Sequence, residues 1–207
     1  MQYYFDFRGR KYSNTAYLNE TGSDSAKGLL QRLDKKPITE RGFYWMLVNI
    51  ASNAAMPTGR EDGRKTDKIP LNDRFEWALG NEEVLIDYAN NPKLSRGWMF
   101  AEKPWQFLAG CIEFRNLRNW QKLFPDDPYG YESHGEAYLD GTTNGSQHLC
   151  ALMRDETTAE YVNLVKTEYP GDLYTYISNK VWEDLKEESD QFSKKYTSEL
   201  ETFLDNF

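Results

Sequence analysis

The stretch at residues 135–153 reads GEAYLDGTTNGSQHLCALM, and it decides the local fold that we expect at the centre of this chain. Its first six residues predict a short strand from Gly135 to Asp140. The glycine, threonine and asparagine residues that follow are typical of a turn. Leu149, Leu152 and Met153 then recur at helical spacing. The stretch therefore predicts a strand that carries a carboxylate into a turn, with a helix behind it.

A carboxylate in that position suits a magnesium ion. Mg²⁺ prefers oxygen ligands, takes one or two from the protein and leaves other positions to phosphates and water. Asp140 and the carbonyl of Gly141 are therefore candidate ligands. Asp-Gly is also a favoured turn pair, so a purely structural turn is the competing interpretation.

A second polar turn lies near the N-terminus, where residues 3–12 read YYFDFRGRKY. The aromatic residues predict two extended segments, and Gly9 predicts the turn between them. Arg8 and Arg10 on such a turn can each form bidentate hydrogen bonds with phosphate oxygens. Asp6 could orient one of the two guanidinium groups. The alternative interpretation is an exposed basic turn without a ligand.

Composition excludes several classes of protein. The 207 residues carry 25 Lys and Arg against 33 Asp and Glu, a net charge of −8, and 15% are aromatic. Aromatic content this high argues against a disordered acidic tail. We see no apolar run long enough for a membrane span and no secretory signal, so we expect a cytoplasmic location without membrane contact. The acidity argues against a protein that binds nucleic acid through its bulk charge.

The two cysteines, Cys111 and Cys150, each lie in an apolar helical pattern, which favours two buried thiols over a disulfide. His134 and His148 are the only histidines, so no zinc-type spacing occurs.

Apolar periodicity and helix caps predict an α+β fold that is predominantly helical, with a short antiparallel sheet. Residues 57–70 are rich in charged residues and glycine, and we expect a surface loop there. Helices are expected over residues 23–33, 40–50, 72–88 with a break near Gly80, 104–120 and 172–207. Another helix, which carries Leu149, Leu152 and Met153, is expected after the turn at residues 141–145.

Three strings occur in a particular order: DxxGR at residues 6–10, KGLL at residues 27–30 and DGxxxGxQH at residues 140–148. This series closely resembles the palm of the single-subunit DNA-dependent RNA polymerases of bacteriophages and mitochondria. The resemblance covers roughly residues 3–186, and the last string is similar to motif A of that family. It implies a partial palm domain over residues 1–186. Residues 187–207 match no pattern of the family, and their apolar spacing predicts a C-terminal helix that docks a partner, covers the core or begins the fingers.

The resemblance also implies roles for individual residues. Asp140 would be a catalytic metal ligand for Mg²⁺, with the Gly141 carbonyl as a further ligand, in two-metal transfer of nucleotides from NTPs to an RNA 3′ end. Arg10 would contact the template or hybrid backbone, and Arg8 is a weaker candidate for the same role. Lys27 matches a lysine along the RNA–DNA hybrid. Gln147 and His148 match the motif without an assigned role, and a core-supporting role is favoured for His148.

Two further motifs of the family are absent from this sequence. The first is a helix with a Lys/Tyr-Gly motif; Pro125 and Pro128 interrupt the most similar segment of this sequence, so it cannot form one continuous helix. The second is a hairpin with a His-Asp-Ser motif, and this sequence contains no His-Asp pair. We therefore expect a DNA-directed RNA polymerase subunit that is inactive alone. Its expected partners are the DNA template, nascent RNA, NTPs and a complementary subunit carrying the fingers and second palm segment. The alternative is a noncatalytic interaction protein or a decayed polymerase fragment.

Overall fold

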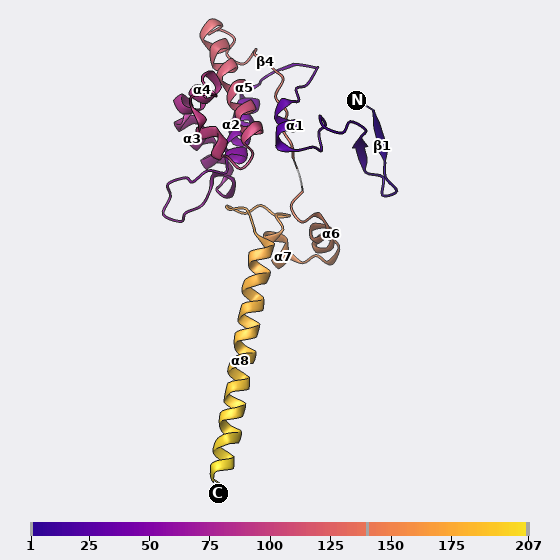
Figure 1. The fold of residues 1–207 in the computed structure, drawn as a ribbon, viewed down its shortest axis with the longest axis vertical. Coiled ribbons are helices and arrows are strands. Elements are labelled where there is room, and N and C mark those ends of the chain that lie inside the picture. Colours follow the sequence, from indigo (N-terminus) through magenta and orange to yellow (C-terminus); the bar gives the residue numbers. More distant parts are fainter. Residues whose placement is uncertain (1, 140, 206–207) are drawn as a thin grey trace. The chain divides into compact units, whose positions relative to one another are not determined.

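A computed structural model describes residues 2–139 and 141–205 (Figure 1). The chain divides into two compact units, Met1–Leu139 and Asp140–Phe207. The first unit contains β1 (Tyr3–Phe5), β2 (Lys11–Ser13), α1 (Asp24–Leu29), β3 (Lys36–Pro37), α2 (Glu40–Ala54), the 3-10 helix η1 (Thr66–Lys68), α3 (Leu71–Gly80), α4 (Glu82–Asn90), the 3-10 helix η2 (Arg96–Phe100), α5 (Pro104–Leu123) and β4 (Glu132–Ser133). The second contains α6 (Asn144–Met153), α7 (Glu156–Tyr161) and α8 (Leu173–Asp205).

The expected fold class is confirmed, because helices predominate and the described strands form two short antiparallel pairs. In the first pair Tyr3 lies opposite Ser13. In the second pair Lys36 lies opposite Ser133, which joins the segment after α1 to the segment after α5.

The expected strand from Gly135 to Asp140 is wrong in its described part, because residues 135–139 have no regular secondary structure. A strand requires a neighbour that completes its hydrogen-bond ladder. Here β3 pairs only with Glu132 and Ser133, so the ladder ends before Gly135. Asp140 itself lies outside the described residues.

Helix starts agree with the caps read from the sequence. The hydroxyl of Ser23 accepts from the Ala26 N–H at the start of α1, and that of Thr39 accepts from Gly42 at the start of α2. Helix α1 ends earlier than expected, since Leu30 is already extended. The Arg32 N–H instead donates to the His134 carbonyl at 3.2 Å, so tertiary pairing replaces the last helical turn.

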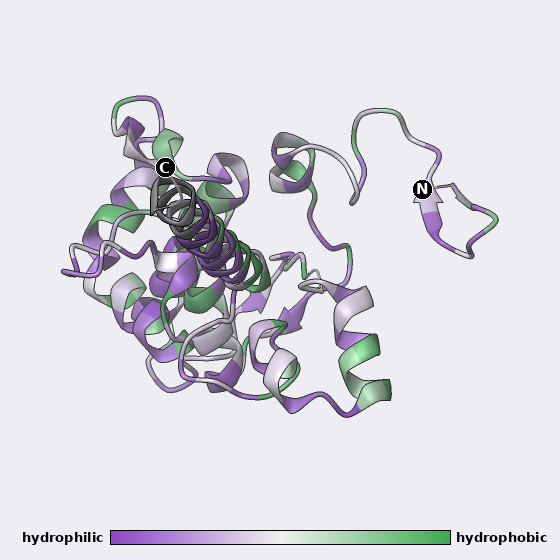
Figure 2. Cartoon of the chain, turned by 90° about the horizontal axis from the view of Figure 1, so that it is seen from below, coloured by the Kyte–Doolittle hydropathy of each residue, from purple (hydrophilic) through white to green (hydrophobic). Residues whose placement is uncertain are grey.

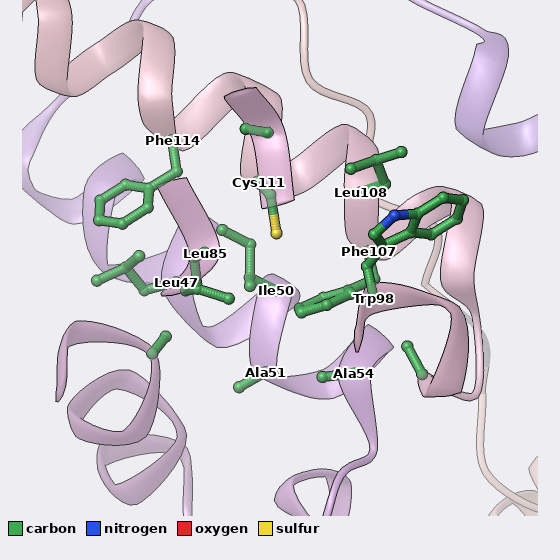
Figure 3. Packing of buried hydrophobic residues seen from close by; sticks show 13 residues of the cluster. Leu47, Ile50, Ala51, Ala54, Leu85, Trp98, Phe107, Leu108, Cys111 and Phe114 are labelled. Atoms are coloured by element: carbon green, nitrogen blue, oxygen red, sulfur yellow. The ribbon is translucent and has the colours of Figure 1, made fainter. Parts of the chain in front are cut away.

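The core of the N-terminal unit lies between α2, α3, α4 and α5 (Figure 3). Ile50 of α2 points toward Phe107 and Cys111 of α5, and all three side chains are fully buried. Gly110 faces Ile50, and a Cβ atom there would lie 2.8 Å from the nearest side-chain carbon of Ile50. The close approach of α2 and α5 therefore depends on a glycine.

The charged segment at residues 57–70 is a loop, as expected, whose base is anchored in the helical core. The Thr66 hydroxyl is buried and donates to the Ala51 carbonyl at 2.6 Å. Arg74 of α3 donates to the carbonyls of Asp67 and Ile69. These bonds tie the end of the loop to α2 and α3.

The C-terminal unit has a small core formed by Cys150, Ala159 and Val162, against which Leu173 packs. Cys111 and Cys150 are both buried and free, as expected. Asn163 has a positive φ of 59°, and its amide both donates to and accepts from the backbone of Gly171. This clamp closes the loop between α7 and α8.

Helix α8 runs continuously across residue 186, where we expected a boundary, so the two compact units do not coincide with that division. It carries both hydrophilic and hydrophobic residues along its length (Figure 2), and the described side chains at Val181, Trp182, Leu185 and Phe192 are exposed. Among the helices described, none is both long and apolar enough to cross a membrane.

Candidate nucleic-acid interface and metal position

The turn between β1 and β2 is built around the carboxylate of Asp6. Its Oδ1 atom accepts the backbone N–H groups of Arg8 and Arg10, each at 2.9 Å. The Gly9 N–H donates to the Asp6 carbonyl at 3.0 Å, and Gly9 has a φ of +77°, which favours glycine. The DxxGR string is therefore the set of residues that this turn requires.

Asp6 orients Arg8 rather than Arg10. Its Oδ2 atom accepts from Nε of Arg8 at 2.9 Å and lies 2.8 Å from Nη2. Partial desolvation raises the pKa of Asp6, but hydrogen bonds from Arg10 and Arg8 outweigh it, so the pKa of Asp6 lies below its ordinary value. The carboxylate therefore stays ionised and holds the turn throughout the neutral range.

The Arg10 side chain is exposed and makes no hydrogen bond or ion pair with any described residue. Its five donors are consequently available to phosphate oxygens, which guanidinium groups bind in a forked geometry. The side chain of Phe7 in the same turn is 97% exposed, and Tyr4 stacks on Tyr12 at 5.7 Å. The turn thus presents the Arg10 guanidinium to solvent, and its one interaction with a described residue is a coulombic attraction to Asp6.

Lys27 lies in the last turn of α1. Its Nζ atom lies 5.2 Å from the centre of the Tyr138 ring, and the Tyr138 hydroxyl donates to the Lys27 carbonyl at 3.4 Å. No carboxylate among the described residues lies within ion-pair distance of its ammonium group. Lys27 is thus held near Tyr138 but keeps its charge unpaired.

The candidate metal position falls in the C-terminal unit. Asp140 is not described, whereas Gly141 is exposed and precedes α6. A Cβ atom on Gly141 would make ordinary contact with Asn144 at 3.5 Å, so packing alone does not require glycine there. Within residues 2–139 and 141–205, no three carboxylate, histidine or cysteine side chains form a metal-binding group. The described residues therefore supply no complete ligand set.

The two motif residues without an expected role are now placed. The Gln147 side chain donates from Nε2 to the Val162 carbonyl at 2.6 Å, which ties α6 to the end of α7. His148 is exposed and makes no hydrogen bond to another described residue. The favoured core-supporting role belongs to Gln147 rather than to His148.

Sequence reasoning missed two acidic residues of the N-terminal unit. Asp24 of α1 accepts from the backbone of Trp105 at 2.7 Å and of Gln106 at 3.2 Å, and so caps the start of α5. Glu113 of α5 is 8% exposed and accepts from Tyr131 and Ser133. A polar residue on the apolar face of the expected helix at 104–120 is the signal that could have identified Glu113.

The structure brings Arg8 and Arg10 into one turn and places Lys27 in the same compact unit. Gly141 belongs to the other unit. The cationic residues and the metal position are therefore described as two separate sites.

Comparison with known proteins gives one consistent family. A profile described as DNA-dependent RNA polymerase matches residues 36–206. The chain is 36% identical over 184 residues to the mitochondrial DNA-directed RNA polymerase of Neurospora crassa. The matched segment covers 88% of this chain and 12% of the relative. It is 35% identical to DNA-directed RNA polymerase 1, mitochondrial, of Arabidopsis thaliana, over 90% of the chain and 18% of that protein.

The human mitochondrial DNA-directed RNA polymerase is 32% identical over 96% of the chain and 15% of its own length. The chain thus spans less than one fifth of each of these relatives. The expected cytoplasmic location is wrong, because the matched relatives are mitochondrial or chloroplastic enzymes and point to organelles. The match over most of its length shows that the chain belongs to the phage-type and mitochondrial single-subunit DNA-dependent RNA polymerase family.

Proposed function

We propose that this chain is the first palm segment of a DNA-directed RNA polymerase and that it acts with a complementary polypeptide. In this proposal the chain contributes Asp140 to nucleotide transfer and Arg10 to binding of the nucleic-acid backbone. The complementary polypeptide contributes the fingers and the second palm segment. The reaction is the addition of NTPs to an RNA 3′ end on a DNA template.

The observation that supports the proposal is that the two arginine side chains of the DxxGR turn have different contacts. Asp6 uses both carboxylate oxygens to hold the backbone and the Arg8 side chain, while the Arg10 guanidinium remains unpaired among described residues. The turn therefore leaves the Arg10 guanidinium, which is linked to Asp6 only by a coulombic attraction, accessible to phosphate oxygens.

Asp140 and the Gly141 carbonyl would hold Mg²⁺ in the assembled enzyme. In the two-metal reaction, one ion would lower the pKa of the attacking RNA 3′ hydroxyl, and the second would stabilise the pyrophosphate leaving group. The described residues contain no group of three ligating side chains, and Asp140 lies outside them. The remaining carboxylate ligand would come from the complementary polypeptide.

Partner dependence is supported by the missing motifs. Neither the Lys/Tyr-Gly helix nor the His-Asp-Ser hairpin occurs in the sequence. Lys27 would lie along the RNA–DNA hybrid, and Arg8 would support Arg10.

The test combines the chain with the purified polypeptide that carries the two missing motifs. Templated RNA synthesis is measured for each component alone and for the mixture, in the presence of Mg²⁺. Synthesis by the mixture only is the expected result, and Asp140→Asn should abolish it. Asp126→Asn is the matched control, because Asp126 is exposed and makes no contact with another described residue.

Each outcome decides between the alternatives. Full synthesis by the Asp140→Asn mixture would refute the metal assignment. A complex that forms normally but makes no RNA with the unaltered chain would favour the noncatalytic interaction protein. RNA synthesis by the chain alone would refute partner dependence.

A further inference from the structure

The N-terminal unit contains a cavity of about 560 Å³ that no role assigned above explains. Its walls come from α1, α2, α5 and residues 133–138, and both Trp45 and Trp105 border it. This volume lies within the range of pockets that bind drug-sized ligands. Its apolar lining is formed largely by Leu30, Ile38, Trp45, Met46, Trp105, Leu108 and Ile112.

A buried carboxylate lies in the wall of this cavity. Glu113 is 8% exposed, and its Oε2 atom accepts from the Ser133 hydroxyl at 2.8 Å and the Tyr131 hydroxyl at 3.1 Å. Its Oε1 atom accepts from no described residue, and no described cation lies within ion-pair distance. Oε1 is not among the fully enclosed side-chain oxygens without a partner, so it is accessible to a donor that enters the cavity.

Glu113 is the buried carboxylate among the described residues that line the cavity, whereas Asp34, Glu136 and Lys36 are exposed. Arg32 is paired with Glu136 at 3.9 Å, and Lys27 lies over the Tyr138 ring. Burial and the neighbouring Glu113 raise the pKa of Tyr131 to about 12, so its hydroxyl remains a donor. The complement of this wall is an apolar body that carries one positive charge.

The segment after β4 adds open backbone groups to the same wall. Residues 133–138 border the cavity, yet the backbone of Glu136 and Ala137 makes no hydrogen bond with a described residue. Extended peptide segments commonly bind by pairing with such groups, while pockets select alternate side chains. An extended occupant would therefore satisfy both the backbone and the apolar walls.

We propose that this cavity binds an extended apolar segment of the complementary polymerase polypeptide, which places a lysine or arginine side chain against Glu113. The identity of the occupant rests on the proposed function, in which a complementary polypeptide carries the two motifs that this sequence lacks. The chemistry of the occupant rests on the cavity alone. An experiment can therefore contradict the identity of the occupant and the chemistry of the occupant independently.

The test uses the full chain and two blocked heptapeptides of alternating valine and threonine, one with a central arginine and one with norleucine there. Binding is followed by the anisotropy of a fluorescent label on the peptide. We expect the arginine peptide to bind at least about tenfold more tightly, since one well-formed charged pair is worth a factor of this order. Glu113→Gln should bring the two affinities within about twofold of each other.

Glu102→Gln is the matched control, because Glu102 is exposed, does not border the cavity and should leave the preference unchanged. Hydrogen exchange supplies a second measurement on the unaltered chain, where the arginine peptide should slow exchange of the amides at Glu136 and Ala137. This measurement remains decisive even where Glu113→Gln fails to fold.

Equal binding of the two peptides, no binding of either, or a preference that survives Glu113→Gln would overturn the proposal. A dimer of the chain that Glu113→Gln dissociates would show that a second copy is the occupant, which also overturns it. None of these readouts uses RNA synthesis. Loss of synthesis in the reconstituted enzyme and loss of peptide binding are therefore distinguishable.

Discussion

Replacing Gly28 with alanine tests the packing that positions Lys27. A Cβ atom at Gly28 would lie 2.6 Å from the carbonyl carbon and 2.7 Å from the carbonyl oxygen of Trp105. Both obstructing atoms are backbone, so α1 must move away from α5. Overpacking of this kind costs about 1–3 kcal/mol, and alanine recovers up to about 1 kcal/mol of helix propensity. Because backbone atoms obstruct the added carbon, the upper end of this cost applies, and we expect a net loss near 2 kcal/mol.

Urea unfolding followed by tryptophan fluorescence measures this loss. The Trp98 and Trp105 rings lie 5.4 Å apart beside the affected contact, so their emission reports on it. A loss near 2 kcal/mol should also lower the melting temperature by about 4–8 °C. The Asp24 cap on α5 should weaken in the same variant, because α1 carries it.

Gly80→Ala is the matched control. Gly80 is the last residue of α3, and a Cβ atom there would meet nothing within 4 Å. The same chemical change should therefore leave stability unaltered or raise it by up to about 1 kcal/mol. A Gly28→Ala chain that unfolds at the same or a higher urea concentration than the unaltered chain would refute the packing argument.

Three further outcomes are expected. In the reconstituted complex, Arg10→Ala should weaken DNA binding and reduce the slope of log affinity against log salt by about 0.9, whereas the exposed Arg41→Ala should leave that slope unchanged. Burial raises the pKa of the Cys111 thiol, so a thiol reagent should label Cys111 only after unfolding, and rapid labelling of the native chain would contradict its burial. Folding raises the pKa of Tyr131 to about 12, from about 10 in the unfolded chain. The contribution of Tyr131 to stability should therefore be complete below about pH 10 and lost as the pH rises through about 12. Over this pH range, the urea midpoint of Tyr131→Phe should fall less than that of the unaltered chain.

Helix boundaries were the most accessible part of the fold from sequence, because local chemistry sets them. The Thr39 cap, the break at Gly80 and the start of α5 at Pro104 all lie where the sequence predicts them. Each depends on residues within one helical turn. The strand at residues 135–139 failed for the opposite reason, since a strand depends on a partner distant in the sequence.

The candidate site shows the same contrast. The pattern of residues 6–10 predicted a turn in which Asp6 orients one guanidinium group, and the structure identifies that group as Arg8. The place of Glu113 on an apolar helix face is a signal in the sequence, but its donors could not be predicted, because they lie 18 and 20 residues away on another segment. The assignments of Asp140, Arg10 and Lys27 remain predictions for the reconstituted enzyme to test.

The attachment of α8 has a consequence for how the chain loses structure. Its first turns are held by the Tyr161–Tyr176 ring contact and by Leu173 in the small core. Between Val181 and Tyr196, the described side-chain interactions are confined to the helix itself, such as the Phe192–Tyr196 ring contact. Helical segments without tertiary packing are marginally stable in water. Opening of α8 should therefore be graded along its axis, with the lowest opening free energy farthest from the clamp between Asn163 and Gly171.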